Sequence, residues 1–203
     1  MLIASLSVHE AAHAWAADRL GDPTARHLGR LSLNPAVHVD PIGTLLFPLI
    51  SMLTNLPLIG WAKPVPVDPR HLRHPKRDFA IIAAAGPASN MVMAVLGAVI
   101  LAVIPDSAPG DIAGGAVTGP LVSLFRGFVV INVLLAVFNM LPVPPLDGGN
   151  VLIGVLPHAG ARVVEQLRPY GFLVLYALMF TGTLNFLLGD VAFSIVRLLL
   201  RLP

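Results

Sequence analysis

The stretch FAIIAAAGPASNMVMAVLGAVILAVI occupies residues 79–104 and contains no charged side chain. A helix needs about 20 residues to cross the hydrocarbon core of a bilayer, which is about 30 Å thick. This stretch is therefore long enough and apolar enough to span a membrane. Residues 116–141 carry one charge, at Arg126, and residues 170–188 carry none. Both of these stretches are also long enough to span.

The composition of the whole chain agrees with a lipid environment. Of 203 residues, 56% are hydrophobic and 12% are charged, whereas soluble domains have about 25% charged residues. The net charge of +2, with 13 basic residues, does not indicate a nucleic-acid-binding surface. The absence of cysteine excludes disulfides and Cys-based zinc sites. We therefore expect an all-α, polytopic transmembrane helical bundle that forms a single domain over residues 1–203.

A further apolar stretch, residues 41–59, is interrupted by Pro48 and Pro57. Proline removes a backbone hydrogen bond and breaks a helix. Within a membrane, such irregular backbone is tolerated only where protein or a water-filled cavity covers it. The stretch could span the membrane or re-enter on the same side, so we expect a broken or re-entrant segment near the site described next.

The basic residues predict an orientation. Five of them lie in residues 60–78, whereas residues 105–115 contain none. Cytoplasmic loops carry an excess of Lys and Arg, so the first loop is expected to be cytoplasmic. The helix over residues 116–141 then returns to the cytoplasmic side. We expect a multi-pass protein of the cell (plasma) membrane.

The residues His9, Glu10 and His13 lie in an otherwise apolar stretch, residues 2–20. On a helix, positions i and i+4 lie on one face, so two imidazoles can bind one zinc ion, and the glutamate can act as a general base. Ionisable groups at membrane depth cost about 2.5–3.5 kcal/mol each, so they are rarely without a function. The alternative is a polar helix face that is hydrogen-bonded inside the bundle.

Catalytic zinc needs a third protein ligand, and Asp147 is the best-placed candidate. Three prolines precede it in residues 142–145, and Gly148 and Gly149 follow it. The prolines end the preceding helix, and the glycines free the backbone beside the carboxylate. An ordinary surface turn has the same composition. Glu165 is the alternative third ligand, but it lacks the Asp-Gly context.

The His-Glu motif of residues 9–13, followed after a later span by Leu146-Asp147-Gly148, resembles the site-2 protease family of intramembrane zinc metalloproteases. Residues 86–90, with the sequence GPASN, resemble the glycine-proline-asparagine helix of that family. Residues 60–67 resemble a short prokaryotic branch of it. The resemblance covers residues 8–149 and rests on two separated motifs in the expected order.

The resemblance implies a role for each matching residue. His9, His13 and Asp147 would be the ligands of one Zn²⁺ per chain. Glu10 would activate water for hydrolysis. Asn139 would polarise the scissile carbonyl or stabilise the oxyanion, unless its side chain only satisfies backbone groups at the helix end.

The resemblance also implies a zinc metalloendopeptidase whose partners are transmembrane protein substrates and the lipid bilayer. Lys63, Pro64 and Val65 begin a segment that could pair with an unwound substrate strand or form a Pro-rich surface loop. Two other functions stay open: a divalent-metal transporter and a catalytically inactive membrane scaffold of the same fold.

The other polar residues are given structural roles. We expect Asn90 to form hydrogen bonds between helices. The remaining histidines lie in predicted loops, where we expect solvated surface side chains: His27, His38, His71, His74 and His158.

Overall fold

A computed structural model of the chain describes residues 1–54, 63–104 and 112–201. Within these ranges the protein is helical and contains no β-strand. Its α-helices are α1 (Leu2–Arg19), α2 (Thr24–His27), α3 (Phe47–Thr54), α4 (Pro75–Val103), α5 (Ile112–Asn139), α6 (Asp147–Val155), α7 (His158–Leu167), α8 (Gly171–Phe180) and α9 (Thr183–Leu199). Short helical turns are η1 (Pro35–Val37), η2 (Pro41–Leu46), η3 (Pro69–His71) and η4 (Arg168–Tyr170). The expectation of an all-α fold is confirmed.

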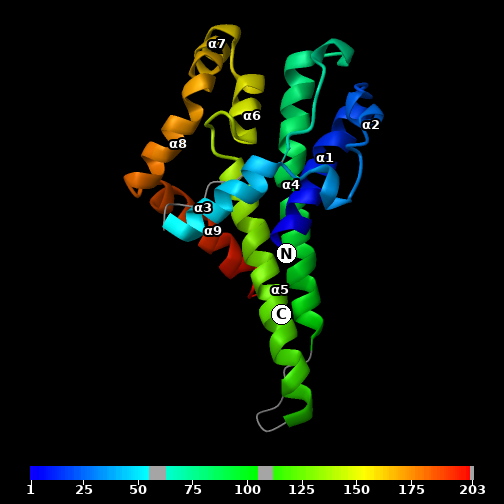
Figure 1. Cartoon of the computed structure of the whole chain (residues 1–203), viewed down its shortest axis with the longest axis vertical. Coiled ribbons are helices and arrows are strands. Elements are labelled where there is room, and N and C mark those ends of the chain that lie inside the picture. Colours follow the sequence, from blue (N-terminus) through cyan, green and yellow to red (C-terminus); the bar gives the residue numbers. More distant parts are fainter. Residues whose placement is uncertain (55–62, 105–111, 202–203) are drawn as a thin grey trace.

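Two long helices, α4 and α5, run side by side along the molecule (Figure 1). The 29 residues of α4 give a length of about 43 Å at 1.5 Å per residue. Pro75 occupies the first turn, and the Asp78 carboxylate accepts the backbone N–H of His74, so the helix start is capped. Pro75–Val103 and Thr118–Asn139 are each long and apolar enough to cross a membrane. These helices correspond to the first two spans expected from the sequence.

The expected single helix over residues 170–188 is wrong. The chain forms α8, then turns at Gly182 and continues as α9 in a new direction (Figure 1). Gly182 has a φ of 73°, a left-handed conformation that glycine adopts without steric cost. The helices have 10 and 17 residues, so neither reaches the length of about 20 residues that a full span needs.

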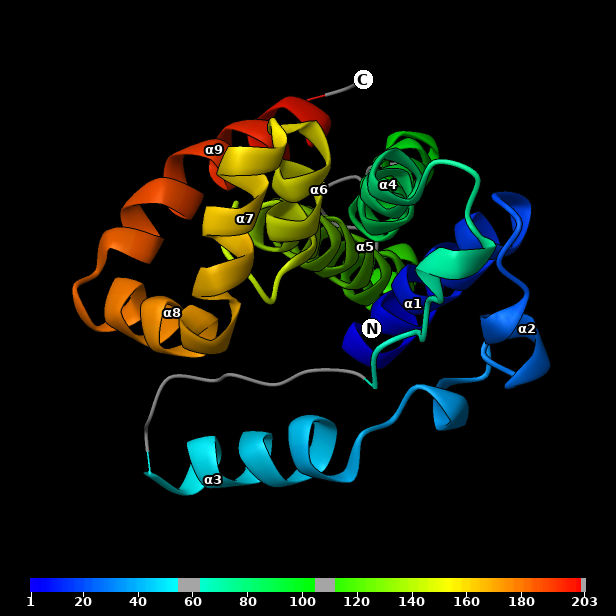
Figure 2. The ribbon, with the colours of Figure 1, turned by 90° about the horizontal axis from the view of Figure 1, so that it is seen from above.

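The apolar stretch over residues 41–59 forms η2 and α3 as far as Thr54, and residues 55–59 lie outside the described ranges. Seen from above, α3 lies to one side of the α4–α5 pair (Figure 2). Whether this stretch spans the membrane or re-enters stays a prediction.

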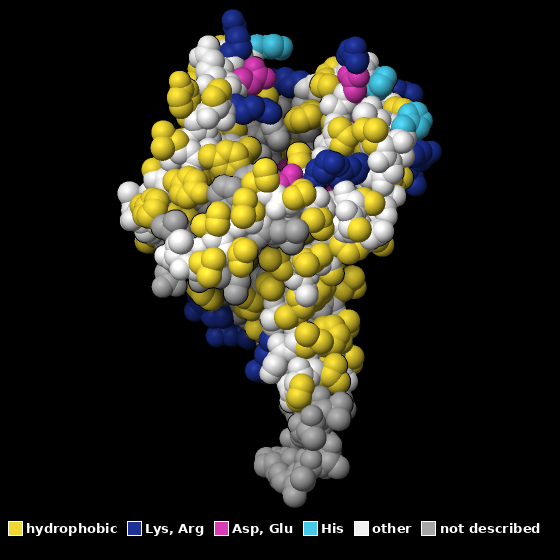
Figure 3. Space-filling model, viewed as in Figure 1, with side chains coloured by type: hydrophobic (Ala, Val, Ile, Leu, Met, Phe, Trp, Pro, Cys, Tyr) yellow, Lys and Arg dark blue, Asp and Glu magenta, His cyan; other side chains and the backbone are white. Residues whose placement is uncertain are grey.

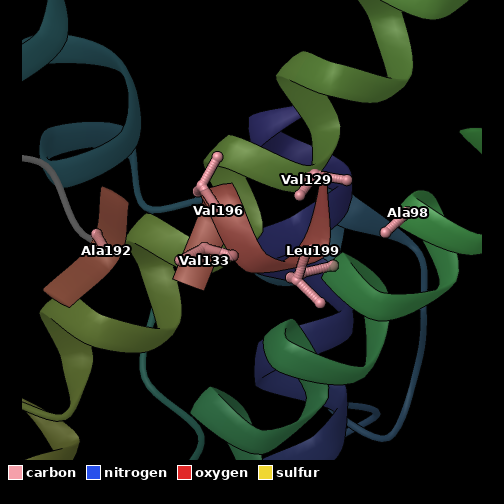
Figure 4. Close-up of a cluster of buried hydrophobic side chains, with 7 residues drawn as sticks. Ala98, Val129, Val133, Ala192, Val196 and Leu199 are labelled. Atoms are coloured by element: carbon pink, nitrogen blue, oxygen red, sulfur yellow. The ribbon is translucent and has the colours of Figure 1, made fainter. Parts of the chain in front are cut away.

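The largest group of buried apolar side chains joins α4, α5 and α9 (Figure 4). It consists of Ala94, Ala98, Val129, Val133, Ala192, Val196 and Leu199. Small side chains on α4 allow α5 to approach closely, and close packing drives helix association in lipid. A Cβ atom added at Gly97 would lie 3.0 Å from the Phe128 ring, so glycine belongs to the same contact.

Hydrophobic side chains cover much of the face shown in Figure 3. Exposed large side chains on α4 include Val92, Leu96 and Val103. In the view of Figure 3 the charged side chains gather mainly at the top, over α7 and the beginning of α4, with a smaller basic group lower down. This distribution suits a molecule whose long helices contact lipid and whose upper end meets water.

Helix α6 is held against the first turns of α4. A Cβ atom at Gly154 would lie 2.2 Å from the Ala80 Cβ atom and 3.1 Å from the Lys76 carbonyl oxygen. The Lys76 ammonium donates a hydrogen bond to the carbonyl of Leu156. Because Asp147 begins α6, this contact also sets the position of its carboxylate.

Replacing Gly154 with alanine is expected to push α6 away from α4. Overpacking of this kind costs about 1–3 kcal/mol. The midpoint of unfolding in detergent should fall, and bound zinc should decrease, compared with the parent protein. Gly160→Ala is the matched control, because its Cβ atom would lie 3.6 Å from the Leu156 side chain, an ordinary contact distance. Equal behaviour of the two variants would contradict the packing described here.

Candidate metal centre and active site

Helix α1 directs three polar side chains to its buried face. His9, Glu10 and His13 are 4%, 9% and 8% exposed. The helix is rich in alanine, which favours helix formation, and it packs against α4. It ends at Arg19, and Gly21, two residues later, has a φ of 107°, which favours glycine. The expected i, i+4 pairing of the two histidines on one helix face is present.

Asp147 is the first residue of α6 and follows the turn over residues 140–146. The two glycines after it allow α6 to start directly against this turn. A Cβ atom at Gly148 would lie 2.3 Å from the Met140 carbonyl oxygen, and one at Gly149 would lie 2.6 Å from the Pro144 nitrogen. Any side chain at these two positions would therefore move the aspartate. The helix N-terminus also favours a negative charge there.

The structure brings His9, His13 and Asp147 together as a group with metal-binding spacing. The Asp147 Oδ2 atom lies 3.1 Å from His9 Nε2 and 3.4 Å from His13 Nε2. The two Nε2 atoms are 3.0 Å apart. Four ligands at about 2.0–2.2 Å from a tetrahedral zinc ion are separated from one another by about 3.3–3.5 Å. The three observed separations are close to that value.

The tautomer of His13 follows from its other ring nitrogen. His13 Nδ1 lies 2.7 Å from the Ile82 carbonyl oxygen on α4. A carbonyl oxygen only accepts hydrogen bonds, so Nδ1 carries the proton and donates it. The Nε2 atom of His13 therefore has a free lone pair.

The tautomer of His9 is set by a longer chain of hydrogen bonds. Asn132 on α5 donates from Nδ2 to the Phe128 carbonyl at 2.9 Å, which turns its Oδ1 atom towards Asn90. Asn90 donates from Nδ2 to that Oδ1 atom at 3.0 Å and to the Ser5 carbonyl at 3.4 Å. Its own Oδ1 atom consequently accepts the Nδ1 proton of His9 at 2.6 Å. In the neutral form of both imidazoles, the Nε2 atoms of His9 and His13 are therefore unprotonated.

The hydrogen bonds of the two imidazoles indicate whether His9, His13 and Asp147 can bind a metal ion. Two unprotonated nitrogens and a carboxylate oxygen converge, and lone pairs in such an arrangement repel one another. Asp147 Oδ2 is buried and accepts no hydrogen bond from the described residues. A cation relieves both the repulsion and the missing partner, and two imidazoles with one carboxylate form a recognised zinc ligand set. His9, His13 and Asp147 therefore fit zinc.

The space for the histidine pair depends on Gly86. A Cβ atom at this position would lie 2.4 Å from His13 Nε2 and 2.6 Å from the Cε1 atoms of both His13 and His9. Ile82, Gly86 and Asn90 are four residues apart on α4, so they share the face that meets α1. One face of α4 thus provides the Ile82 carbonyl as the acceptor for His13 and the Asn90 amide as the acceptor for His9. Gly86, which lies between them on α4, leaves room for both imidazole rings.

Glu10 lies beside the candidate metal ligands. Its carboxylate interacts electrostatically with His9, His13 and Asp147, and also with His38. A buried carboxylate next to the first histidine of the pair is placed to exchange a proton with water at the metal.

The other predicted site residues are not part of the group of three. Asn139, the last residue of α5, is half-buried and donates its side-chain N–H to the Leu135 carbonyl at 3.0 Å. No contact between this side chain and the group of three is found in the described structure, so its catalytic role stays a prediction. Glu165, the alternative third ligand, is exposed on α7 and is not part of that group.

Lys63, Pro64 and Val65 belong to a non-helical segment that leads into η3. The Lys63 N–H donates to the His38 carbonyl at 2.8 Å. Lys63 and Pro64 are exposed. Their predicted contact with a substrate strand stays a prediction.

The segment after Val65 is tied to the end of α1 through Asp22. The Asp22 carboxylate, fully buried, accepts hydrogen bonds from the Asp68 N–H at 2.7 Å and from the Thr24 hydroxyl at 2.5 Å. Burial alone would raise the pKa of Asp22, but these hydrogen bonds stabilise the carboxylate and hold its pKa below the usual value. The segment is therefore fixed relative to the helix that carries His9 and His13.

The predicted surface histidines divide into two groups. His27, His71, His74 and His158 are exposed, as expected. His38 is only 3% exposed, so its assignment to the solvated surface is wrong. The physical reason is that η1 packs against α1, and this contact covers the imidazole that follows η1.

Two histidines and one carboxylate that converge in a helical protein form the kind of ligand set found in zinc metallopeptidases. The model of peptidase family M50 matches residues 1–182, so the chain belongs to this family, the site-2 proteases. Zinc is the metal of these enzymes.

Named relatives agree with this assignment. The protein named "Putative zinc metalloprotease YwhC" from Bacillus subtilis (strain 168) is 36% identical over 180 residues, 89% of this chain and 78% of that protein. "Putative zinc metalloprotease Rip2" from Mycolicibacterium smegmatis is 32% identical over 181 residues. This match covers 89% of the chain but only 65% of Rip2, less than two thirds of its length. The search for similar solved structures found no match.

Sequence reasoning did not assign site roles to three features. These are the Ile82 carbonyl, the open space at Gly86 and the amide of Asn132 that orients Asn90. The four-residue spacing of residues 82, 86 and 90 was the available signal for a shared helix face. A backbone carbonyl acceptor, however, carries no signature in the residue type.

Replacing Asp147 with alanine is expected to remove one of three ligands and to leave two imidazoles facing each other. The purified parent in detergent should retain about one tightly bound zinc per chain, and the variant much less. Elemental analysis after gel filtration measures both. Glu165→Ala is the matched carboxylate control and should keep the zinc of the parent. Zinc retained by Asp147→Ala would contradict the assignment of this ligand.

Replacing Asn90 with leucine removes the acceptor for His9 Nδ1–H, so the imidazole loses its fixed orientation. Loss of such a partner typically lowers metal affinity about 10–100-fold. Competition with a zinc-binding dye measures the affinity. Ser89→Ala is a neighbouring control on the same helix, since the Ser89 hydroxyl donates to the Gly86 carbonyl of its own helix. Similar affinities of the two variants would mean that the amide does not support the ligand.

Proposed function

We propose that the protein is an intramembrane zinc endopeptidase that hydrolyses peptide bonds within or near the transmembrane segments of membrane proteins. We further propose that it is a multi-pass protein of a prokaryotic plasma membrane. The observation that carries the proposal is the burial of His9, Glu10 and His13 against α4, itself long and apolar enough to span a bilayer. A protease active on soluble substrates would have no need to place its ionisable groups there.

The arrangement supports a general-base mechanism. Zinc, when bound by His9, His13 and Asp147, would act as a Lewis acid and lower the pKa of a coordinated water. Glu10 accepts a proton from the attacking water and passes it to the leaving amine. Asn90 and the Ile82 carbonyl hold the imidazoles in one tautomer and orientation while this occurs.

The substrate must be unwound locally, because a helical peptide bond is hydrogen-bonded and shielded. The segment that starts with Lys63, Pro64 and Val65 has the properties of a strand partner: it is non-helical, and Asp22 anchors its far end at Asp68. We propose that an extended stretch of substrate pairs with this segment. The anchoring supports the proposal because a fixed edge reduces the entropy lost on binding.

Replacing Glu10 with glutamine keeps the size of the side chain but removes the base. Membranes that contain the parent are compared with membranes that contain Glu10→Gln, by mass spectrometry of new protein N-termini. We expect N-termini within or near transmembrane segments that depend on Glu10, and a loss of at least about 100-fold in cleavage, the usual order of general acid–base catalysis.

Two measurements complete this experiment. Fluorescein-labelled β-casein, an unstructured protein, serves as a purified substrate in detergent. Glu10→Gln must retain the zinc of the parent, so that lost cleavage reports lost chemistry. If neither membranes nor casein show cleavage that depends on Glu10, the protein is not a protease of this mechanism. Cleavage confined to soluble proteins would leave a protease but refute the intramembrane assignment.

A further inference from the structure

His38 follows η1 and lies in the interior next to α1. Its side chain is 3% exposed, and η1 packs against the helix that carries the catalytic residues. The imidazole interacts electrostatically with Glu10. None of the roles assigned so far uses this side chain, although it is a buried polar group beside the proposed general base.

The protonation of His38 follows from one hydrogen bond. His38 Nε2 lies 2.8 Å from the Ser32 carbonyl oxygen. Since that oxygen only accepts, Nε2 carries the proton in the neutral imidazole, and Nδ1 is left as an acceptor. Nδ1 is buried and has no hydrogen-bond partner among the described residues. A buried acceptor without a donor destabilises the protein, so a donor that arrives on binding would remove that cost.

The backbone of His38 connects the two parts of the proposed substrate site. Its carbonyl accepts the Lys63 N–H at 2.8 Å, where the proposed substrate-pairing segment begins. His38 is therefore bonded through its backbone to Lys63 and is near enough to Glu10 to interact with its carboxylate. An extended peptide that pairs with this segment and reaches Glu10 carries a row of backbone N–H groups, the donors that the free Nδ1 atom lacks.

We propose that His38 is a substrate-binding residue of this enzyme, whose Nδ1 atom accepts a hydrogen bond from a backbone N–H of the extended peptide being cleaved. The proposal rests on the endopeptidase function argued above. The ligand of His38 is then an unwound peptide backbone, and His38 itself is neither a metal ligand nor the general base. A helical substrate offers no free N–H at this position, so the contact selects for unwound substrate.

Two substitutions separate this role from a purely structural one. In His38→Gln, the side-chain NH₂ can replace Nε2–H and keep the bond to Ser32, but no acceptor remains at the position of Nδ1. In His38→Asn, the side-chain oxygen can take the position of Nδ1, while the bond to Ser32 is lost. Substrate binding predicts that glutamine is the more harmful replacement; a structural role through Ser32 predicts the reverse.

Binding is measured in the Glu10→Gln background, where fluorescein-labelled β-casein cannot be cut, by fluorescence anisotropy in detergent. His38→Gln is expected to weaken binding about 5- to 100-fold and His38→Asn substantially less. With Glu10 intact, KM for casein should rise with the same order of variants. Zinc content and the unfolding midpoint of His38→Gln should match the parent. His27→Gln, an exposed histidine in the same loop region, is the control and should bind as the parent does.

The outcomes are distinct. If His38→Gln binds casein as the parent does, or if it loses zinc or unfolds early, the proposed contact is refuted. If His38→Asn is the weaker binder, the residue acts through Ser32 and the contact is also refuted. If the parent shows no cleavage that depends on Glu10, the proposed function fails, whereas a selective binding loss in His38→Gln would still establish the peptide contact.

Discussion

Two imidazole nitrogens without protons face each other 3.0 Å apart, with a carboxylate oxygen beside both. This arrangement is unfavourable without a cation, and the rest of the structure enforces it. The Ile82 carbonyl and the Asn90 amide hold each ring by its opposite nitrogen. The glycine at position 86 leaves room for both rings. The helix contacts therefore hold the three side chains in a geometry that a bound cation makes favourable.

The polar network is built where water is scarce, so each member needs a partner. Asn132, Asn90 and His9 come from α5, α4 and α1, and each hydrogen bond fixes the orientation of the next group. Amide and imidazole groups can satisfy one another in apolar surroundings without a net charge, whereas a lone charged group could not. The same bonds hold the three helices in register, so the metal centre and the helix packing stabilise each other.

The sequence predicted the helical class, two apolar helices and the residues that meet at the centre, because composition, i, i+4 spacing and proline-glycine breaks depend on residue type. It failed where tertiary contacts decide. The chain turns at Gly182 in place of a continuous helix, and His38 is buried because η1 packs on α1. A polar loop sequence looks the same whether a helix covers it or not. Likewise, the acceptor for His13 is a main-chain atom of Ile82, whose apolar side chain gives no indication of this contact.

The position of Asp147 at the start of α6 has a consequence for biosynthesis. Helix α1 carries two ligands and the base, but the third ligand follows α4 and α5 in the chain, and Gly154 must then pack on Ala80 to bring it into place. A nascent chain that has inserted only α1 and α4 therefore lacks a complete centre. The three ligands can bind one metal ion together only after α6 has packed on α4.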